Sequence, residues 1–227
     1  IMPCVAKKGE REMDLFYGEY AGHDVDAVLT TRELVKMIRS AHIRPNTLVE
    51  IPGDSPMHAG TGAGVIFGAS GGVLEAALRT AYHTVTGENP EIGEQSPLKV
   101  LRQIGSFKEL EIDIKGVKLH CAALSSLGEA RRLIQAMKRG ECRYDFVEVM
   151  ACPGGCIGGG GNPPKTWSIM EKRKKAIYEA EAELPVRQSH KNPAIQKIYE
   201  TYLGEPCGEL SHKLLHTEYC NRQDLLQ

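Results

Sequence analysis

The sequence predicts an α/β fold in which mixed or parallel sheets are flanked by helices. Short apolar stretches alternate with helical patterns from residue 26 to residue 150, as in strand–helix units. From residue 168 onward only helical patterns occur, so residues 168–227 are expected to form a mainly helical tail. A chain of 227 residues can form one sizeable core or two small lobes that share a cleft.

The composition excludes several classes of function. Hydrophobic residues make up 41% of the chain and charged residues 25%, which is ordinary for a soluble globular protein. The net charge is −1 and there is no Lys/Arg-rich arm, so no nucleic-acid partner is expected. The apolar stretches are too short to span a membrane. Small molecules or other proteins are therefore the expected partners.

The first residues, 1–4, lack the basic and apolar regions of a secretory signal. Ile1 is not an initiator, and a recognisable motif begins directly at Met2. We therefore expect the natural protein to extend N-terminally. The expected location is the cytoplasm, and an export signal to the periplasm in the preceding region stays open.

The first strand–helix unit is expected between residues 26 and 45. Residues 26–30 form a short apolar stretch that is typical of a strand. Thr30 and Glu33 have the spacing of a capping box, which predicts a helix start. Apolar residues then recur with helical spacing up to Ala41, and Pro45 ends the helix.

A glycine-rich segment, residues 53–72, leads into a strong helix pattern over residues 73–85, which Gly87 ends. A glycine-rich loop before a helix leaves backbone N–H groups free at the positive end of the helix dipole. The sequence therefore predicts a site here that suits anionic or strongly polar ligands.

The middle of the chain predicts a hairpin and a second strand–helix unit. Apolar residues alternate on both sides of a turn at Lys115 and Gly116, and residues 119–124 continue as a buried strand. Residues 128–140 predict a helix, with three apolar side chains directed inward: Leu133, Ile134 and Met137.

The next strand, residues 144–150, runs directly into a cysteine loop. Ligands of α/β proteins bind at the carboxyl ends of strands. In the tail, helices are expected at 169–182, 194–203 and 209–216. Asn192 and Pro193 supply the start of the second of these helices, and Gly204 supplies its end.

The cysteine loop carries the strongest chemical signal. Cys152 and Cys156 lie four residues apart among glycines, so both thiolates can reach one metal centre. The glycines allow close backbone approach, and their N–H groups can bond to inorganic sulfides. A tight glycine turn with two incidental cysteines and a zinc site are the alternatives. An odd total of seven cysteines fits reduced thiols better than a disulfide framework.

A second motif opens the chain at Met2, Pro3 and Cys4, with Lys7 three residues after the cysteine. If that turn is helical, Cys4 and Lys7 share a face, and a thiolate and an ammonium can address one ligand. A structural cysteine and a solvated surface lysine are the alternatives when the two residues are taken alone.

Together the two motifs resemble the second and third cluster-binding motifs of [FeFe] (iron-only) hydrogenases. They read Met-Pro-Cys-x-x-Lys-x-x-Glu at residues 2–10 and Glu-x-Met-Ala-Cys-x-x-Gly-Cys-x-x-Gly-Gly-Gly-x-Pro at residues 148–163. Four further segments resemble the same family: residues 24–34, 62–73, 189–193 and 203–206. The resemblance covers nearly the whole chain and implies the C-terminal portion, one lobe or most of one, of a two-lobed catalytic domain.

The resemblance implies a cofactor, the H-cluster. This is a [4Fe–4S] cluster joined through a cysteine sulfur to a di-iron subcluster with CO, cyanide and a bridging azadithiolate. Cys4 and Cys152 match cubane ligands, and Cys156 matches the bridging cysteine. Lys7 matches the lysine that donates to an iron-bound cyanide. The remaining matches to cofactor-contacting positions are Met2, Pro3, Phe67, Gly68, Ser70 and Met150.

Two departures from the family pattern matter. The first motif, Thr-Ser-Cys-Cys-Pro-x-Trp, which supplies the fourth cubane ligand and a proton-passing cysteine, is not in this chain. No other cysteine has a matching context, so these four are expected to be buried or surface thiols: Cys121, Cys142, Cys207 and Cys220. Family members commonly have Ser-Thr where this chain has Gly60 and Thr61, and little consequence is expected.

The resemblance implies reversible H₂ oxidation and proton reduction by a ferredoxin-linked, NAD-linked or multi-subunit enzyme. Ferredoxin or other redox subunits and maturation proteins are the implied partners. The alternatives are a sensory form and a non-catalytic relative, prelamin-recognition-like or acting in iron–sulfur assembly, which binds a cubane only. A zinc-binding structural module would need a fourth Cys or His near the cysteine pair, and none lies nearby in sequence.

Overall fold

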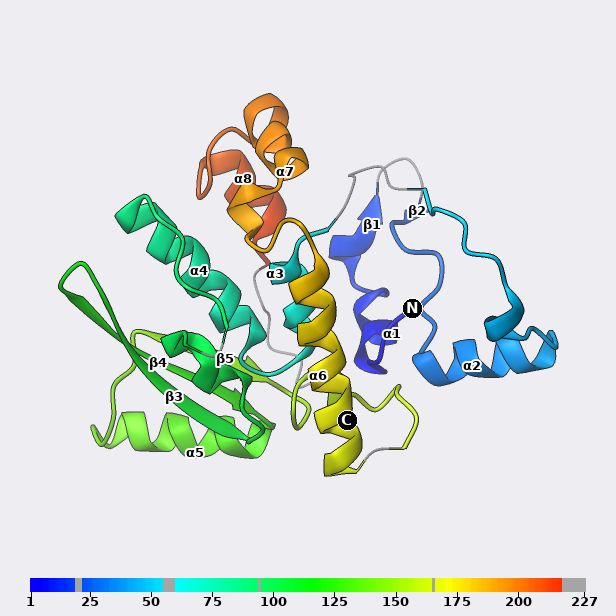
Figure 1. Cartoon of the computed structure of the whole chain (residues 1–227), viewed down its shortest axis with the longest axis horizontal. Coiled ribbons are helices and arrows are strands. Elements are labelled where there is room, and N and C mark those ends of the chain that lie inside the picture. Colours follow the sequence, from blue (N-terminus) through cyan, green and yellow to red (C-terminus); the bar gives the residue numbers. More distant parts are fainter. Residues whose placement is uncertain (19–21, 55–59, 94, 165, 218–227) are drawn as a thin grey trace.

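The computed structural model describes residues 1–18, 22–54, 60–93, 95–164 and 166–217. It combines helices with two small sheets, as Figure 1 shows. The first sheet is a two-stranded antiparallel ribbon of β1 (Tyr17–Gly18) and β2 (Gly22–His23). The second sheet is mixed and carries most of the core. The α/β fold class predicted from the sequence is confirmed. No helix of the described part of the chain is long and apolar enough to cross a membrane.

The mixed sheet has the strand order β3–β4–β5. Strands β3 (Phe107–Ile114) and β4 (Val117–Ser125) form the predicted antiparallel hairpin, in which Ile114 pairs with Val117. Its turn residues Lys115 and Gly116 both have positive φ, at 52° and 85°, as a tight primed turn requires. Strand β5 (Phe146–Met150) then pairs parallel with β4. The second predicted strand–helix unit is therefore confirmed.

Helices cover both faces of this sheet (Figure 1). On one face, alternate residues of β3 pack with helix α4 (Gly72–Thr86), mainly through Leu74 and Leu78. On the other face lies α5 (Leu127–Lys138), which buries Leu133 alone. The predicted inward direction of Ile134 and Met137 is wrong, since their side chains are 52% and 39% exposed. Among the residues of α5, only Leu133 is fully buried.

The glycine-rich segment before α4 is more ordered than a loop. It forms α3 (Gly62–Val65), which Thr61 caps through a hydrogen bond from Gly64, and then a short 3₁₀ turn. A Cβ at Gly72 would lie 1.8 Å from the carbonyl oxygen of Ile66, so no larger residue fits there. Helix α4 confirms the helix predicted at 73–85, and Gly87 ends it with φ of 78°.

The N-terminal elements form the other side of the molecule (Figure 1). They include α1 (Ala6–Glu10) and α2 (Thr31–Ser40). The predicted capping box of α2 is present, because Thr30 and Glu33 exchange both hydrogen bonds. The strand predicted at 26–30 is wrong: only Thr30 pairs, in a single parallel bridge with Met2. Among the described residues, no neighbouring strand is long enough to extend that pairing. Helix α2 buries no side chain fully.

The tail is helical over its described part. Helix α6 (Trp167–Glu183) packs against α3 and the 3₁₀ turn after it, and is followed by α7 (Pro193–Ile198) and α8 (Glu209–Leu215). Asn192 caps α7 as predicted, and a π turn then extends the second predicted helix to Leu203, where Gly204 ends it with φ of 78°. All three helices predicted for this region are therefore present.

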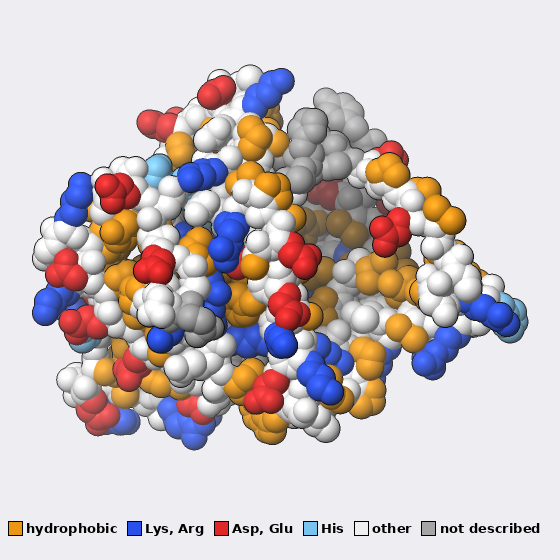
Figure 2. Space-filling view, viewed as in Figure 1, with side chains coloured by type: hydrophobic (Ala, Val, Ile, Leu, Met, Phe, Trp, Pro, Cys, Tyr) orange, Lys and Arg blue, Asp and Glu red, His pale blue; other side chains and the backbone are white. Residues whose placement is uncertain are grey.

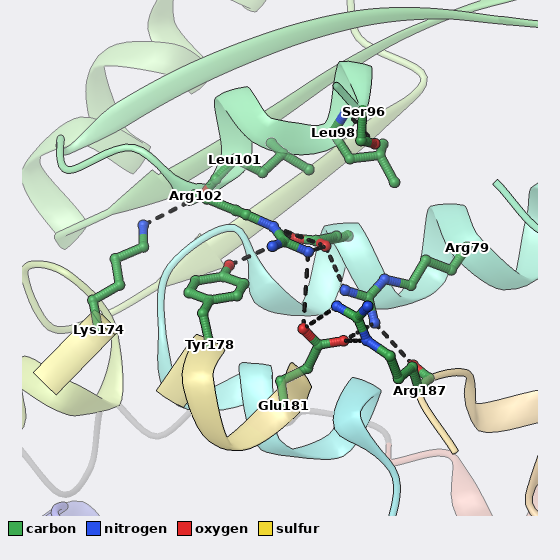
Figure 3. A network of polar contacts seen from close by, with 10 residues as sticks. Arg79, Ser96, Leu98, Leu101, Arg102, Lys174, Tyr178, Glu181 and Arg187 are labelled. Carbon is green, nitrogen blue, oxygen red and sulfur yellow. Dashed lines mark hydrogen bonds and ion pairs between the residues drawn. The ribbon is translucent and has the colours of Figure 1, made fainter. Parts of the chain in front are cut away.

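A buried ionic network links α6 to α4 (Figure 3). The Arg79 guanidinium donates to Glu75 at 2.5 Å and to Glu181 at 3.0 Å, and all three side chains are fully buried. Arg102 and Arg187 add further contacts to the same two carboxylates. Buried charges of this kind hold their elements in one arrangement, because removing one partner leaves the other without compensation.

Candidate metal centre

The cysteine loop begins directly after β5, at the carboxyl end of a strand as predicted. It holds Cys152 and Cys156 in a tight turn, in which Gly154 and Gly155 have φ of 78° and 91°. Two hydrogen bonds fix this turn from both sides of Gly154. Its amide donates to the Ser125 hydroxyl at 3.0 Å, and its carbonyl accepts from the Ser70 amide at 3.0 Å.

The glycines of this loop are required by close contacts with the backbone of other segments. A Cβ at Gly155 would lie 2.5 Å from the amide nitrogen of Ser70. A Cβ at Gly158 would lie 2.0 Å from the carbonyl oxygen of Pro153, and one at Gly159 would lie 2.0 Å from that of Pro3. No real Cβ contact is so short. The glycine run therefore lets the loop pack tightly against two distant parts of the chain.

One of these two distant parts, the segment that contains Pro3, carries the N-terminal motif. The Gly161 amide donates to the Pro3 carbonyl at 3.0 Å, and Met2 pairs with Thr30 in the parallel bridge. The segment that holds Cys4 is thus sandwiched between the glycine run and the start of α2. This packing brings the two predicted cluster motifs together.

The Cys156 thiol lies in the electrostatic field of the other two predicted ligand thiols. Burial raises the pKa of the Cys156 thiol, and the neighbouring Cys4 and Cys152 raise it further. The Lys7 ammonium acts in the opposite direction, and Glu148 adds to the increase. Such effects need close charges. Cys4, Cys152 and Lys7 therefore lie near enough to Cys156 to act on its charge, and all three cysteines are half-buried.

Lys7 lies in α1, but Cys4 precedes that helix, which begins at Ala6. The shared helical face predicted for Cys4 and Lys7 is therefore not how the two meet. Lys7 forms an ion pair with Glu10, one helical turn further along. It also lines a cavity of about 310 Å³ together with Met2 and Arg11. Its ammonium thus pairs with a carboxylate beside this cavity.

The other predicted cofactor-contacting residues lie on the segments around the loop. Ser70 is 1% exposed, and its hydroxyl has no hydrogen-bond partner among the described residues. Phe67 is 45% exposed, and Gly68 lies beside it. Met150 ends β5, two residues before Cys152. An unpaired buried hydroxyl next to the cysteine loop is a group that a bound cofactor can satisfy.

The N-terminus of α4 does not offer the free anion site that the sequence predicts. The Glu148 carboxylate already occupies it, accepting from the amides of Gly71 at 2.6 Å and Leu74 at 2.8 Å. Glu148 is 5% exposed and comes from β5. A carboxylate of the chain itself therefore takes the place predicted for an external anion.

Sequence reasoning also missed several residues that support the site. Asn162 donates from its amide nitrogen to the carbonyl oxygens of Cys156 and Ile157, at 3.1 and 3.0 Å. Ser125 and Glu148 fix the loop and the segment behind it. Glu148 and Asn162 lie inside the cysteine motif, and no other feature of the sequence indicated that they support the site. The role of Glu148 depends on contacts far away in sequence, whereas Asn162 acts within the loop itself.

The remaining cysteines have the expected dispersed positions. Cys121 is buried in the core beneath α4, and Cys207 is exposed. Cys142 is half-buried near α5. Cys220 lies outside the described residues. Over the ranges that the structure describes, no three His, Cys, Asp or Glu side chains are grouped so that they could hold a single metal ion.

The site fits an iron–sulfur cluster. Burial and the neighbouring Cys4 and Cys152 raise the pKa of the Cys156 thiol, and a positive metal centre would favour its thiolate. The glycine amides and the unpaired Ser70 hydroxyl supply donors around that centre. Cys4, Cys152 and Cys156 are the residues that would hold the group.

Comparison with known proteins decides the family. Residues 1–160 match the family model described as the iron-only hydrogenase large subunit, C-terminal domain. The chain belongs to this family. Residues 168–222 match a second model, the iron hydrogenase small subunit.

Solved hydrogenases share the fold. A HydA(ΔEFG) structure that describes stepwise assembly of the [FeFe]-hydrogenase H-cluster has a TM-score of 0.76 and 38% identity. The match covers 96% of this chain and 61% of that one. The family relationship established by the sequence therefore holds for the arrangement of the elements as well.

Curated relatives fall into two groups. The NADP-reducing hydrogenase subunit HndD of Solidesulfovibrio fructosivorans is 42% identical over 99% of this chain and 38% of its own length. The cytosolic iron-sulfur assembly component 3 of Mus musculus is 32% identical over 96% of this chain and 46% of its own length. This chain thus spans less than half the length of both relatives.

Proposed function

We propose that this chain forms part of an [FeFe] hydrogenase that interconverts H₂ with protons and electrons. One observation supports the proposal: the Gly161 amide donates to the Pro3 carbonyl at 3.0 Å and so joins the Cys4 motif to the Cys156 loop, although the two motifs lie at opposite ends of a long segment. The three cysteines alone would suit a simple cubane. The ammonium beside them is the feature that suits a cubane joined to a cyanide-bearing di-iron subcluster.

Each residue has a proposed role in holding the H-cluster. Cys4 and Cys152 bind the cubane, and Cys156 bridges it to the di-iron subcluster. Lys7 donates a charge-assisted hydrogen bond to an iron-bound cyanide. The surrounding contacts come from the remaining predicted positions: Met2, Pro3, Phe67, Gly68, Ser70 and Met150.

The bound group supplies the redox chemistry at iron and the azadithiolate amine for proton transfer. The chain supplies ligation, orientation and exclusion of water. Two hydrogen bonds of Gly154, with the Ser125 hydroxyl and the Ser70 amide, and a set of glycine contacts fix the cysteine loop. Such a rigid loop holds a ligand sulfur in one position.

The fourth cubane ligand and the proton-passing cysteine come, in this proposal, from a segment that precedes the chain. The N-terminal elements leave a large apolar surface for it: Ile1, Val5, Leu15, Tyr17, Val25, Met37, Ile43, Leu48, Val49 and Ile51 are all at least 44% exposed. Figure 2 shows hydrophobic side chains on the side where Figure 1 draws α1, α2 and the segment after α2. Exposed apolar area of this extent marks an interaction surface.

The proposed partners follow from the same assignment. H₂ and protons are the substrates, and ferredoxin or other redox subunits exchange electrons with the cluster. Maturation proteins build the di-iron subcluster. The name of the NADP-reducing relative supports a multi-subunit enzyme in the cytoplasm.

The second candidate is a relative that binds a cubane without hydrogenase chemistry, as the similarity to an iron-sulfur assembly component allows. Lys7 distinguishes the two functions in this proposal, since only the di-iron subcluster would offer its ammonium a cyanide acceptor. Met2 and Met150, which belong to the two motifs, favour the hydrogenase as well.

The direct test is H₂ evolution from reduced viologen by the natural protein after anaerobic maturation. The hydrogenase proposal predicts H₂ evolution that the Cys156→Ser variant abolishes and the Cys142→Ser variant retains. A matured protein that carries a full cubane but evolves no H₂ supports the second candidate instead.

A further inference from the structure

A lysine occupies a core position of the mixed sheet. Residues of β3 alternate between exposed and buried, and Lys108 stands on the buried face with Leu110, Ile112 and Ile114. It is only 6% exposed. Burying an ammonium among apolar side chains is costly unless its donors are satisfied. Lys108 therefore departs from the apolar pattern of the buried face of β3, and such a departure needs a structural or functional reason.

The partners of Lys108 are backbone carbonyls. Its ammonium donates to the carbonyl oxygen of Ser70 at 2.5 Å and to that of Leu101 at 3.1 Å. Burial lowers the pKa of Lys108, whereas contacts with Lys174 and Glu148 raise it. None of the ion pairs of the described residues includes Lys108, so this cation is committed to backbone oxygens.

A buried carboxylate holds the other end of the same peptide. The Ser70 carbonyl and the Gly71 N–H belong to one peptide unit, and that N–H donates to Glu148 at 2.6 Å. The second oxygen of Glu148 accepts from Leu74 at 2.8 Å. A cation thus binds the carbonyl oxygen of the Ser70–Gly71 peptide, and an anion binds its N–H. Peptide groups bonded to charges at both ends are held more strongly than by neutral partners.

This peptide lies directly against the cysteine loop. The Ser70 amide donates to Gly154 at 3.0 Å, and the backbone at Ala69 and Ser70 leaves no room for a Cβ on Gly155. Gly155 precedes Cys156 in the chain. Any shift of the Ser70–Gly71 peptide therefore moves the backbone that carries the Cys156 sulfur.

We propose that Lys108 is a positioning residue for the cluster: with Glu148 it clamps the Ser70–Gly71 peptide and thereby fixes the Cys156 loop. The proposal rests on the cluster ligation described under the proposed function. Lys108 does not touch the cluster. It fixes the position of the Cys156 sulfur indirectly, through the Ser70–Gly71 peptide and the cysteine loop.

Lys174 supplies the matched control. It comes from α6, is also 6% exposed, and donates to the carbonyls of Leu101 at 3.4 Å and Gln103 at 2.7 Å. Figure 3 shows its contact with Leu101. It shares the Leu101 oxygen with Lys108 but makes no hydrogen bond to Ser70. Replacement of either lysine by methionine removes one buried amino group on a side chain of similar size, yet only the Lys108 replacement removes the hydrogen bond to Ser70.

The test compares Lys108→Met and Lys174→Met in the natural protein, reconstituted anaerobically with iron and sulfide. The readouts are the rate at which cubane iron is lost to a chelator, the EPR spectrum of the reduced cubane, and the fraction folded by circular dichroism. We expect Lys108→Met to lose iron about tenfold faster than Lys174→Met and to have an altered EPR spectrum. Lys174→Met should stay within twofold of the wild type. Equal iron loss in the two variants overturns the proposal.

A second variant keeps the test decisive if Lys108→Met folds poorly. Glu148→Gln retains the shape and an acceptor oxygen but removes the anion of the clamp, so we expect faster iron loss with normal folding. In a folded double variant with Lys108→Met the two effects should be non-additive, because both act on one peptide. A Glu148→Gln variant that retains iron like the wild type contradicts the clamp.

The wild type separates this proposal from the proposed function. If the wild-type protein takes up no cubane, the cluster assignment itself is overturned, and the positioning role with it. If the wild type loads normally and both Lys108→Met and Glu148→Gln behave like it, only the positioning role is overturned.

Discussion

The carbonyl oxygen of Pro3 accepts a hydrogen bond from the backbone amide of Gly161 at 3.0 Å. This contact joins the N-terminal motif to the glycine run that follows Cys156. The site is therefore assembled by the fold, because neither motif alone places three thiols together. Its integrity depends on how closely these two backbones approach.

Gly159→Ala tests that approach. The added Cβ would lie 2.0 Å from the Pro3 carbonyl oxygen, while the φ of −61° at Gly159 suits alanine, so the effect is steric alone. We expect a loss of roughly 1–3 kcal/mol in unfolding free energy and weaker cluster binding. Gly160→Ala is the control, since its Cβ would meet only Val5 at 3.8 Å. Denaturant unfolding and iron content measure both effects. Equal behaviour of the two variants would contradict the close contact.

Cys156→Ser should abolish the di-iron subcluster, because a serine oxygen is a poor bridge between iron centres. Cys142 is half-buried as well but lies near α5, and Cys142→Ser should leave iron content unchanged. Iron and acid-labile sulfide per chain measure the difference after maturation. Iron loss from both variants would show that general thiol loss, not ligation, is the cause.

Lys7→Ala should weaken retention of the di-iron subcluster far more than retention of the cubane. The reason is that a donor to cyanide acts only on the subcluster that carries cyanide. Lys8→Ala is the control, since Lys8 is 43% exposed and pairs with Glu33. Cubane EPR and infrared band intensity give the two occupancies separately. Equal loss of both clusters would contradict the role proposed for Lys7.

Lys174 predicts a pH dependence of stability. Burial, and then the nearby Lys108, lower the pKa of Lys174 to about 6, far below its unfolded value. Between that pH and the unfolded pKa, the unfolded chain binds a proton that the folded chain does not, so stability rises with pH. The slope is at most about 1.4 kcal/mol per pH unit. Denaturant unfolding from pH 6 to 8 should show this rise in the wild type and a smaller one in Lys174→Met. If the unfolding free energy depends on pH equally in the wild type and in Lys174→Met, the prediction is wrong.

The ionic network in Figure 3 predicts a large effect of Arg79→Met. This change leaves the fully buried Glu75 and Glu181 carboxylates without their shared partner. We expect a loss of about 3–5 kcal/mol in unfolding free energy. Arg132→Ala removes an ion pair of an arginine that is 72% exposed and should change stability by less than about 0.5 kcal/mol. A small effect at Arg79 would mean that water reaches the network.

Local patterns predicted much of the fold. The capping box of Thr30 and Glu33, the turn at Lys115 and Gly116, and the end of α4 at Gly87 were all readable because neighbours in the sequence determine them. The strand at 26–30 failed for the opposite reason, since a strand needs a partner and only Met2 is available. The exposure of Ile134 likewise depends on the width of a distant sheet.

The candidate site shows the same division. The motifs identified Cys4, Cys152, Cys156 and Lys7, whose residue types and spacing carry the chemistry. Lys108 was not found, because a lysine on a strand is normally directed to solvent and nothing nearby shows that it is buried.

Infrared spectroscopy in the CO and cyanide stretching region tests the central claim most directly. The sample is the natural protein that carries this chain, matured anaerobically with the full set of maturation proteins. The account predicts bands of iron-bound CO and cyanide, with the cyanide bands shifted in Lys7→Ala and all bands lost in Cys156→Ser. A protein that holds a cubane and shows no such bands would contradict assignment of this site as a hydrogenase centre.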